Sequence, residues 1–234
     1  MGHPVARLSS LAALAAVLLA ACGGAEPRPR DDAAPLVIML AAPVAGAADR
    51  LRAGDLAAAR AACEAALAAD PEELSALNDL AVSYLLEGHA EAARRLLDEV
   101  VANGSALEQQ AALLNLGELY ALEGYLDAAE AYLETARGLE RERPEPWYAL
   151  ALLADVRGDP TAARGALKEA LRLDGSGAAR SRFTYLYQEE RAHLEALLAE
   201  AGGDGALAAA RWRELAAGRF GPLTAAAERH LAGE

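Results

Sequence analysis

Four glycines recur at nearly equal spacing, and this spacing constrains the fold more than any other feature of the chain. Gly54, Gly88, Gly124 and Gly158 are separated by 34, 36 and 34 residues. A small or apolar side chain follows each glycine after five and again after nine residues: Ala59, Cys63, Ala93, Leu97, Ala129, Leu133, Ala163 and Leu167. Repetition at this period indicates stacked helix pairs, because one pair cannot bury its apolar face alone. Each glycine is expected to end the first helix of a pair in a left-handed conformation.

Composition agrees with helices and narrows the range of partners. Aromatic residues make up only 5% of the 234 residues. Valine, isoleucine and threonine are few, which disfavours β-sheet. The formal net charge of −13 disfavours nucleic acid and anionic lipid headgroups as partners, because both bind basic groups.

Helix starts can be placed from two Asp-Pro pairs. Asp70-Pro71 precedes Glu72-Glu73, and Asp159-Pro160 follows the last repeat glycine. An aspartate cap with proline in the first helical position is typical of a helix N-terminus. We therefore expect one helix to begin after Asp70 and another after Asp159.

The repeat pattern resembles the tetratricopeptide repeat, a helix–turn–helix unit of 34 residues. The second repeat carries most of the resemblance, with Leu77, Leu80, Ala81, Tyr84, Gly88, Ala93, Leu97 and Val100. The resemblance implies an all-α fold: a right-handed α-solenoid of about four helix hairpins over residues 36–175, the first one degenerate. Residues 176–234 are expected to form C-terminal helices, which are a possible degenerate repeat and cap.

Two segments next to the repeats have no counterpart in the repeat pattern. Residues 36–42 are entirely apolar, and they are interpreted as a first buried helix, a segment that folds back across the solenoid, or an exposed docking strip. Residues 179–200 carry Phe183, Tyr187, Leu194 and Leu198 at helical spacing, which predicts a helix. A further helix pair is predicted over 206–217 and 222–232.

The N-terminus resembles a bacterial lipoprotein signal. Residues 1–21 contain Arg7 and an apolar run that is too short to span a bilayer. The run ends in Leu19-Ala20-Ala21-Cys22, which is similar to a lipobox. The resemblance implies cleavage before Cys22, lipid on its sulfur, and a flexible tether over 22–35. Gly23 after the cysteine implies the outer membrane, with the protein on its periplasmic face.

No group of residues predicts catalysis, a metal site or a cofactor. The chain has no glycine-rich phosphate loop and no nucleophile motif. Glu189 and His193 lie four residues apart on the predicted helix, but a second pair of metal ligands is missing. Cys63 is expected to be a buried core residue. The sequence thus predicts neither an enzyme nor a small-molecule substrate.

The family resemblance implies a concave groove lined by the first helix of each repeat. Its predicted lining is Asn78, Val82, Leu85, Leu86, Leu114, Glu118, Leu122, Tyr148, Leu152 and Asp155. None of these residues is basic, so the groove lacks the lysines and arginines with which some members hold a C-terminal carboxylate. An apolar lining suits a helix or apolar strip of a partner, unless residues 36–42 or the C-terminal helices fill it.

These features together predict an adaptor of the cell envelope, anchored by lipid and binding another envelope protein through the groove. Such lipoproteins resemble, distantly, the pilotins that assist assembly of type IV pilus secretins. A scaffold or regulator of a cell-wall synthase or protease is the alternative, and an enzyme with an unrecognised site is the third hypothesis.

Overall fold

The structure is a computed structural model that describes residues 32–40 and 47–233. The signal sequence, Cys22 and Gly23 lie outside these residues, as does Pro43 of the first repeat. No helix in the described ranges is long and apolar enough to cross a membrane.

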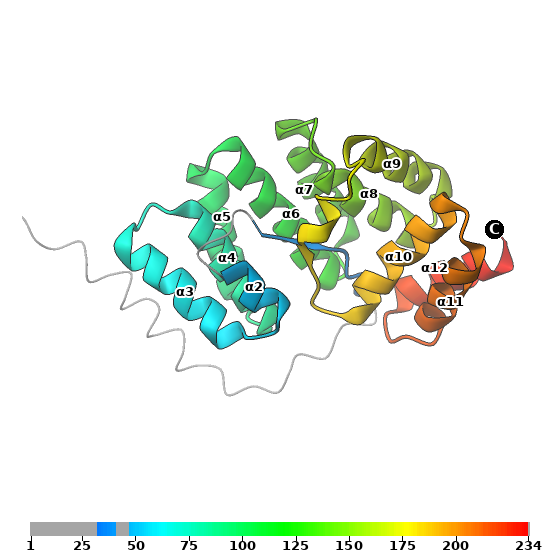
Figure 1. Ribbon diagram of the computed structural model, residues 1–234, viewed down its shortest axis with the longest axis horizontal. Coiled ribbons are helices and arrows are strands. Elements are labelled where there is room, and N and C mark those ends of the chain that lie inside the picture. The colour runs from blue at the N-terminus through cyan, green and yellow to red at the C-terminus, as the bar shows by residue number, and fades with distance from the viewer. Residues whose placement is uncertain (1–31, 41–46, 234) are drawn as a thin grey trace, which may run out of the picture.

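Four helix hairpins follow one another along the chain and pack side by side (Figure 1). This confirms the all-α solenoid of hairpins. The pairs are α2 (Ala47–Arg52) with α3 (Leu56–Ala69), α4 (Leu74–Leu86) with α5 (Ala90–Asn103), α6 (Ala106–Leu122) with α7 (Leu126–Leu139), and α8 (Glu145–Val156) with α9 (Pro160–Leu173).

The turn glycines adopt the predicted left-handed conformation. Gly54, Gly88, Gly124 and Gly158 have φ between +76° and +80°. A further glycine, Gly117 on α6, lets two helices approach closely, since a Cβ atom there would lie 2.7 Å from the Leu133 side chain. Ala129 faces the same contact and is fully buried. The small residues of the repeat therefore set the distance between paired helices.

One of the two predicted helix starts is confirmed and the other is wrong. The Asp159 carboxylate accepts hydrogen bonds from the N–H groups of Thr161 and Ala162 at the start of α9. Asp70 instead ends α3, and its carboxylate accepts from Glu72 N–H at 3.0 Å. That bond closes a short turn, so α4 begins four residues later, at Leu74.

The C-terminal region contains α10 (Gln188–Gly202), α11 (Gly205–Ala216) and α12 (Gly221–Ala232). The helix predicted over 179–200 is wrong in its first part. A 3-10 turn (Arg180–Arg182) and a strand β2 (Phe183–Thr184) precede α10. The Asp174 carboxylate accepts from Ala179 N–H and Arg180 N–H, which bends the chain there. Phe183 then pairs with another strand and is not available to a helix.

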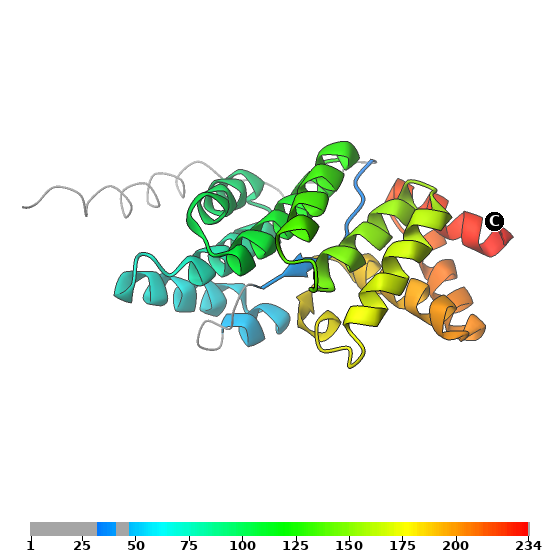
Figure 2. The ribbon, with the colours of Figure 1, turned by 90° about the horizontal axis from the view of Figure 1, so that it is seen from above.

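That other strand lies in the apolar N-terminal segment. The segment contains β1 (Ile38–Met39), so the interpretation of 36–42 as a first buried helix is wrong for its described residues. Residues 33–40, which we call the groove segment, are all buried. In both ribbon views it runs through the middle of the molecule (Figures 1 and 2). Ala33 and Ala34, predicted to be part of the tether, thus belong to the fold.

Candidate functional site

The groove is formed by α4, α6 and α8, the first helices of three successive repeats. Every predicted lining residue lies on these helices. Two of them, Leu86 and Leu122, are partly exposed, and the other eight are buried: Asn78, Val82, Leu85, Leu114, Glu118, Tyr148, Leu152 and Asp155. The expectation of an open groove is therefore wrong for this structure, because the groove segment and the C-terminal region cover it.

The amide of Asn115 holds the main chain of the groove segment. Its Oδ1 accepts from Met39 N–H at 2.8 Å, and its Nδ2 donates to the Met39 carbonyl at 2.8 Å. Asn78 also donates to the Met39 carbonyl, at 3.4 Å, and its Oδ1 accepts from Asn115 at 3.1 Å. Two neighbouring repeats thus contribute one amide each to a single backbone position.

Glu118 holds the same segment one turn further along α6. Its Oε2 accepts from Leu36 N–H at 2.6 Å. The segment also follows the end of the helix, where Ala34 N–H donates to the Ala121 carbonyl at 2.9 Å. Since these partners bind backbone groups, they do not depend on the side chains of the segment.

Strand β2 covers the other edge of the groove segment. The two strands are antiparallel, with Ile38 opposite Thr184 and Met39 opposite Phe183. Phe183 is buried against Tyr148 of α8, with the ring centroids 5.8 Å apart. The groove segment therefore lies between the repeat helices and the connection from α9 to α10.

Two acidic residues at this closure are fully buried. Glu118 accepts from the groove segment, and Glu190 of α10 accepts from Leu186 N–H at 2.7 Å. Burial raises the pKa of Glu118 to about 8, although hydrogen bonds from Leu36 and Val37 oppose it. Burial also raises the pKa of Glu190 well above its ordinary value, and the charge of Glu118 adds to the shift.

A second polar network joins α8 to the C-terminal helices. Asp155 accepts from two imidazoles, His193 Nε2 and His230 Nε2, each at 2.8 Å. The other nitrogen of His230 lies 2.9 Å from Glu200 Oε1, and the ring stacks on Trp212 at 4.0 Å between centroids. His193 thus pairs with Asp155 and not with Glu189. No group of three or more possible metal ligands gathers among the described residues.

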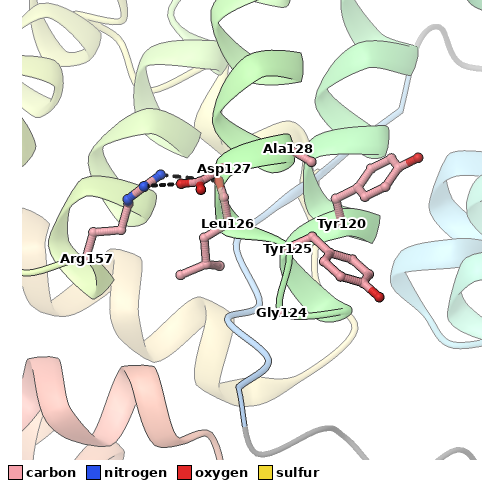
Figure 3. Close-up of a pocket in the computed structure, with 7 residues that line it drawn as sticks. All are labelled: Tyr120, Gly124, Tyr125, Leu126, Asp127, Ala128 and Arg157. Atoms are coloured by element: carbon pink, nitrogen blue, oxygen red, sulfur yellow. Dashed lines mark hydrogen bonds and ion pairs between the residues drawn. The ribbon is translucent and has the colours of Figure 1, made fainter.

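A shallow hollow at the turn between α6 and α7 is the other feature of interest (Figure 3). It is lined by Tyr120, Gly124, Tyr125, Leu126, Asp127, Ala128 and Arg157. Arg157 spans it and forms ion pairs with Asp127 and Glu130. None of the predicted groove residues lines this hollow, so it is separate from the groove.

Sequence reasoning missed Asn115 and Glu190, which fasten the closure. Asn115 stands in the apolar run from Leu113 to Leu116, and a lone amide in such a run is a signal that a buried polar partner exists. Glu190 offered no comparable signal, because Glu189 precedes it and both read as surface residues of a helix.

The family comparison agrees with this geometry. Residues 50–113 and residues 111–142 both match the tetratricopeptide repeat family. The chain therefore carries tetratricopeptide repeats over these residues and is similar to proteins of that family. The matches run from within α2 to just past the end of α7, and α8 with α9 packs on as a fourth hairpin. Domains of this kind bind other proteins and are typically not enzymes. No curated protein matches the chain.

Proposed function

We propose that this protein is a cell-envelope adaptor, anchored to the membrane by lipid on Cys22, that binds an extended apolar strand of another envelope protein in its groove. The observation that carries the proposal is the recognition of the groove segment through its main chain. Glu118 accepts from the N–H of Leu36, and Asn115 binds both the N–H and the carbonyl of Met39. Any extended strand without proline at these two positions presents the same groups, so a partner strand is able to replace the resident one.

The composition of the resident strand defines the partner's chemistry. Residues 33–40 are Ala-Ala-Pro-Leu-Val-Ile-Met-Leu, without a charged side chain. The floor of the groove is apolar around the two polar anchors, with Val82, Leu114 and Leu152 buried. A charged side chain packed against these apolar residues would lose its hydration. The partner is therefore an uncharged strand that also pairs with β2.

The site of action follows from the lipobox at Cys22. Asp32 is the first described residue, ten positions after Cys22. Ten residues reach at most about 35 Å when extended. A lipid on Cys22 would hold the groove close to the membrane, which suits assembly of a membrane-embedded complex such as a pilus or secretion secretin.

The groove is tested by locking the resident strand in place. Ile38 and Thr184 are directly paired, so the double variant Ile38→Cys/Thr184→Cys is able to form a disulfide across the strands. Tagged protein is purified from detergent-solubilised membranes with and without reductant. We expect one partner to be captured by the reduced variant and lost from the oxidised one.

The single variant Thr184→Cys provides the control, since it cannot form the crosslink and should capture the partner under both conditions. Equal capture by the oxidised and reduced double variants would place binding outside the groove. Anchoring is tested separately. Cys22→Ser should leave the precursor unprocessed, and wild-type protein that fractionates as freely soluble would contradict the lipid anchor.

A further inference from the structure

The two strands that close the groove are each fastened by a buried carboxyl group. Glu118 of α6 accepts from Leu36 N–H beside β1, at 2.6 Å. Glu190 of α10 accepts from Leu186 N–H just after β2, at 2.7 Å. The strands themselves are paired to each other. Glu118 and Glu190, which we call the acid pair, therefore hold opposite sides of one closure.

If both carboxyls of the acid pair were ionised, their two buried negative charges would receive little stabilisation from neighbouring groups. Both side chains have no solvent exposure. One oxygen of each, Oε1, has no hydrogen-bond partner among the described residues. No cation acts on either carboxyl among the causes of their pKa shifts, and the charge of Glu118 further raises the pKa of Glu190. Two like charges in a buried site cannot both be held at low cost.

The surrounding titratable groups do not supply the missing charge. The groove segment has none. On α10, Glu189 adds negative charge, and it pairs with Arg219 at 3.3 Å. Arg219 lies over the Tyr187 ring, and Arg191 lies over the Tyr185 ring. Both guanidinium groups are thus engaged with the tyrosines that precede α10 and not with the acid pair.

We propose that the acid pair is a proton-operated latch. It keeps β1 and β2 in the groove while it retains a proton, and it loosens both strands when both carboxyls are ionised. Opening brings water to the carboxyls, and the released proton passes to solvent. The latch deepens the proposed function, on which its biological meaning rests, because it sets when the groove is available to a partner strand.

The direction of the pH effect follows from linkage. A carboxyl whose folded-state pKa lies above its ordinary 4.5 stabilises the closed state most at low pH. That stability is lost as pH rises from 4.5 towards about 8, the folded pKa of Glu118. For each proton released, the opening equilibrium shifts by at most about tenfold per pH unit.

Amide hydrogen exchange on the full chain tests the latch without any partner. The rates are corrected for intrinsic exchange and compared at pH 6 and pH 8. For wild type, we expect protection of residues 36–39 and 185–187 to fall by about tenfold to a hundredfold over this range. The amides of α5 should keep their protection, because they lie away from the closure.

The variants Glu190→Gln and Glu118→Gln keep an oxygen that accepts a hydrogen bond but cannot ionise. Each should reduce the pH effect on the strands, and the double variant should abolish it. Glu189→Gln, on the same helix, should behave like wild type. Wild-type strands whose protection does not change with pH would overturn the latch, even if the variants fail to fold. So would a parallel loss of protection in α5, which indicates global unfolding.

The outcomes separate the latch from the proposed function. If the strands open with pH but the crosslinked variant still captures its partner, the latch stands and the groove is not the binding site. If capture depends on the crosslink but exchange does not depend on pH, the groove stands and the latch is wrong.

Discussion

Asn115 brackets Met39: one side-chain amide accepts the N–H and donates to the carbonyl of the same residue, both at 2.8 Å. This arrangement binds the backbone of an extended chain and fixes its position along the groove. It also explains why a polar side chain is tolerated in the middle of α6, where Asn115 has no solvent exposure. Its amide satisfies two backbone groups that no helix or sheet partner reaches on that side.

The first prediction concerns this bracket. Asn115→Ala removes both bonds and leaves the Met39 backbone groups buried with one weak partner, Asn78. We expect a loss of about 2–4 kcal/mol in the free energy of unfolding, measured by urea denaturation. Asn103→Ala is the matched control, because Asn103 is exposed and bonds only within its own helix. A loss no larger than that of the control would mean that the bracket does not stabilise the fold.

The second prediction concerns the contact between paired helices. Ala129 is fully buried where α7 approaches Gly117 of α6. Ala129→Trp should force the hairpin apart and destabilise the protein by about 1–3 kcal/mol or more, seen as a lower melting temperature in circular dichroism. Ala131→Trp, at an exposed position of the same helix, should be nearly neutral. If the two variants have the same melting temperature, the small residue at position 129 does not control the spacing between the paired helices.

The third prediction is that aspartate in the groove lowers the stability of the protein, which is the opposite of what an open groove would give. Were Leu122 and Leu152 free to contact a partner, aspartate at both positions would leave stability intact. Leu152 has no solvent exposure, whereas Leu122 is partly exposed. We expect Leu152→Asp alone to cost about 3 kcal/mol or more, since it buries an unpaired carboxyl. Leu122→Asp should cost less. Both single variants are measured by urea denaturation, and the groove would be open if neither is destabilised.

The fourth prediction concerns the network around Asp155. Burial opposes charge on His230, but Asp155 and Glu200 outweigh it and raise the pKa of the imidazole above its ordinary 6.5. Its contribution to stability is therefore complete below pH 6.5 and is lost as pH rises through the folded pKa. Wild type should exceed His230→Gln by about 1–3 kcal/mol at pH 6 and by less at pH 9.

The difference between two proteins at each pH removes effects that they share, including the ionisation of Glu118 and Glu190. His89→Gln serves as the control, because the His89 side chain is 40% exposed at the start of α5 and lies away from Asp155. A gap between wild type and His230→Gln that is the same at both pH values would show that His230 is not charged in the folded protein.

Sequence alone determined the repeat array, because its signals are local. A turn glycine must adopt positive φ, and a crossing point must hold a small side chain, so both leave a residue type at a fixed spacing. The residue types at Gly88 and Ala93 therefore indicate the local structure around these two positions. The burial of Cys63 was predicted for the same reason, and burial raises the pKa of its thiol to about 12.

Only the tertiary structure decided how the groove is filled. The apolar run of 36–42 has no period that distinguishes a helix from a strand. Its conformation depends on partners far along the chain: Glu118 is 82 residues from Leu36, and Asn115 is 76 residues from Met39. Strand β2 exists because β1 lies beside it. A backbone conformation fixed by distant hydrogen bonds leaves no pattern in the segment itself, so the closed groove could not be read from the sequence.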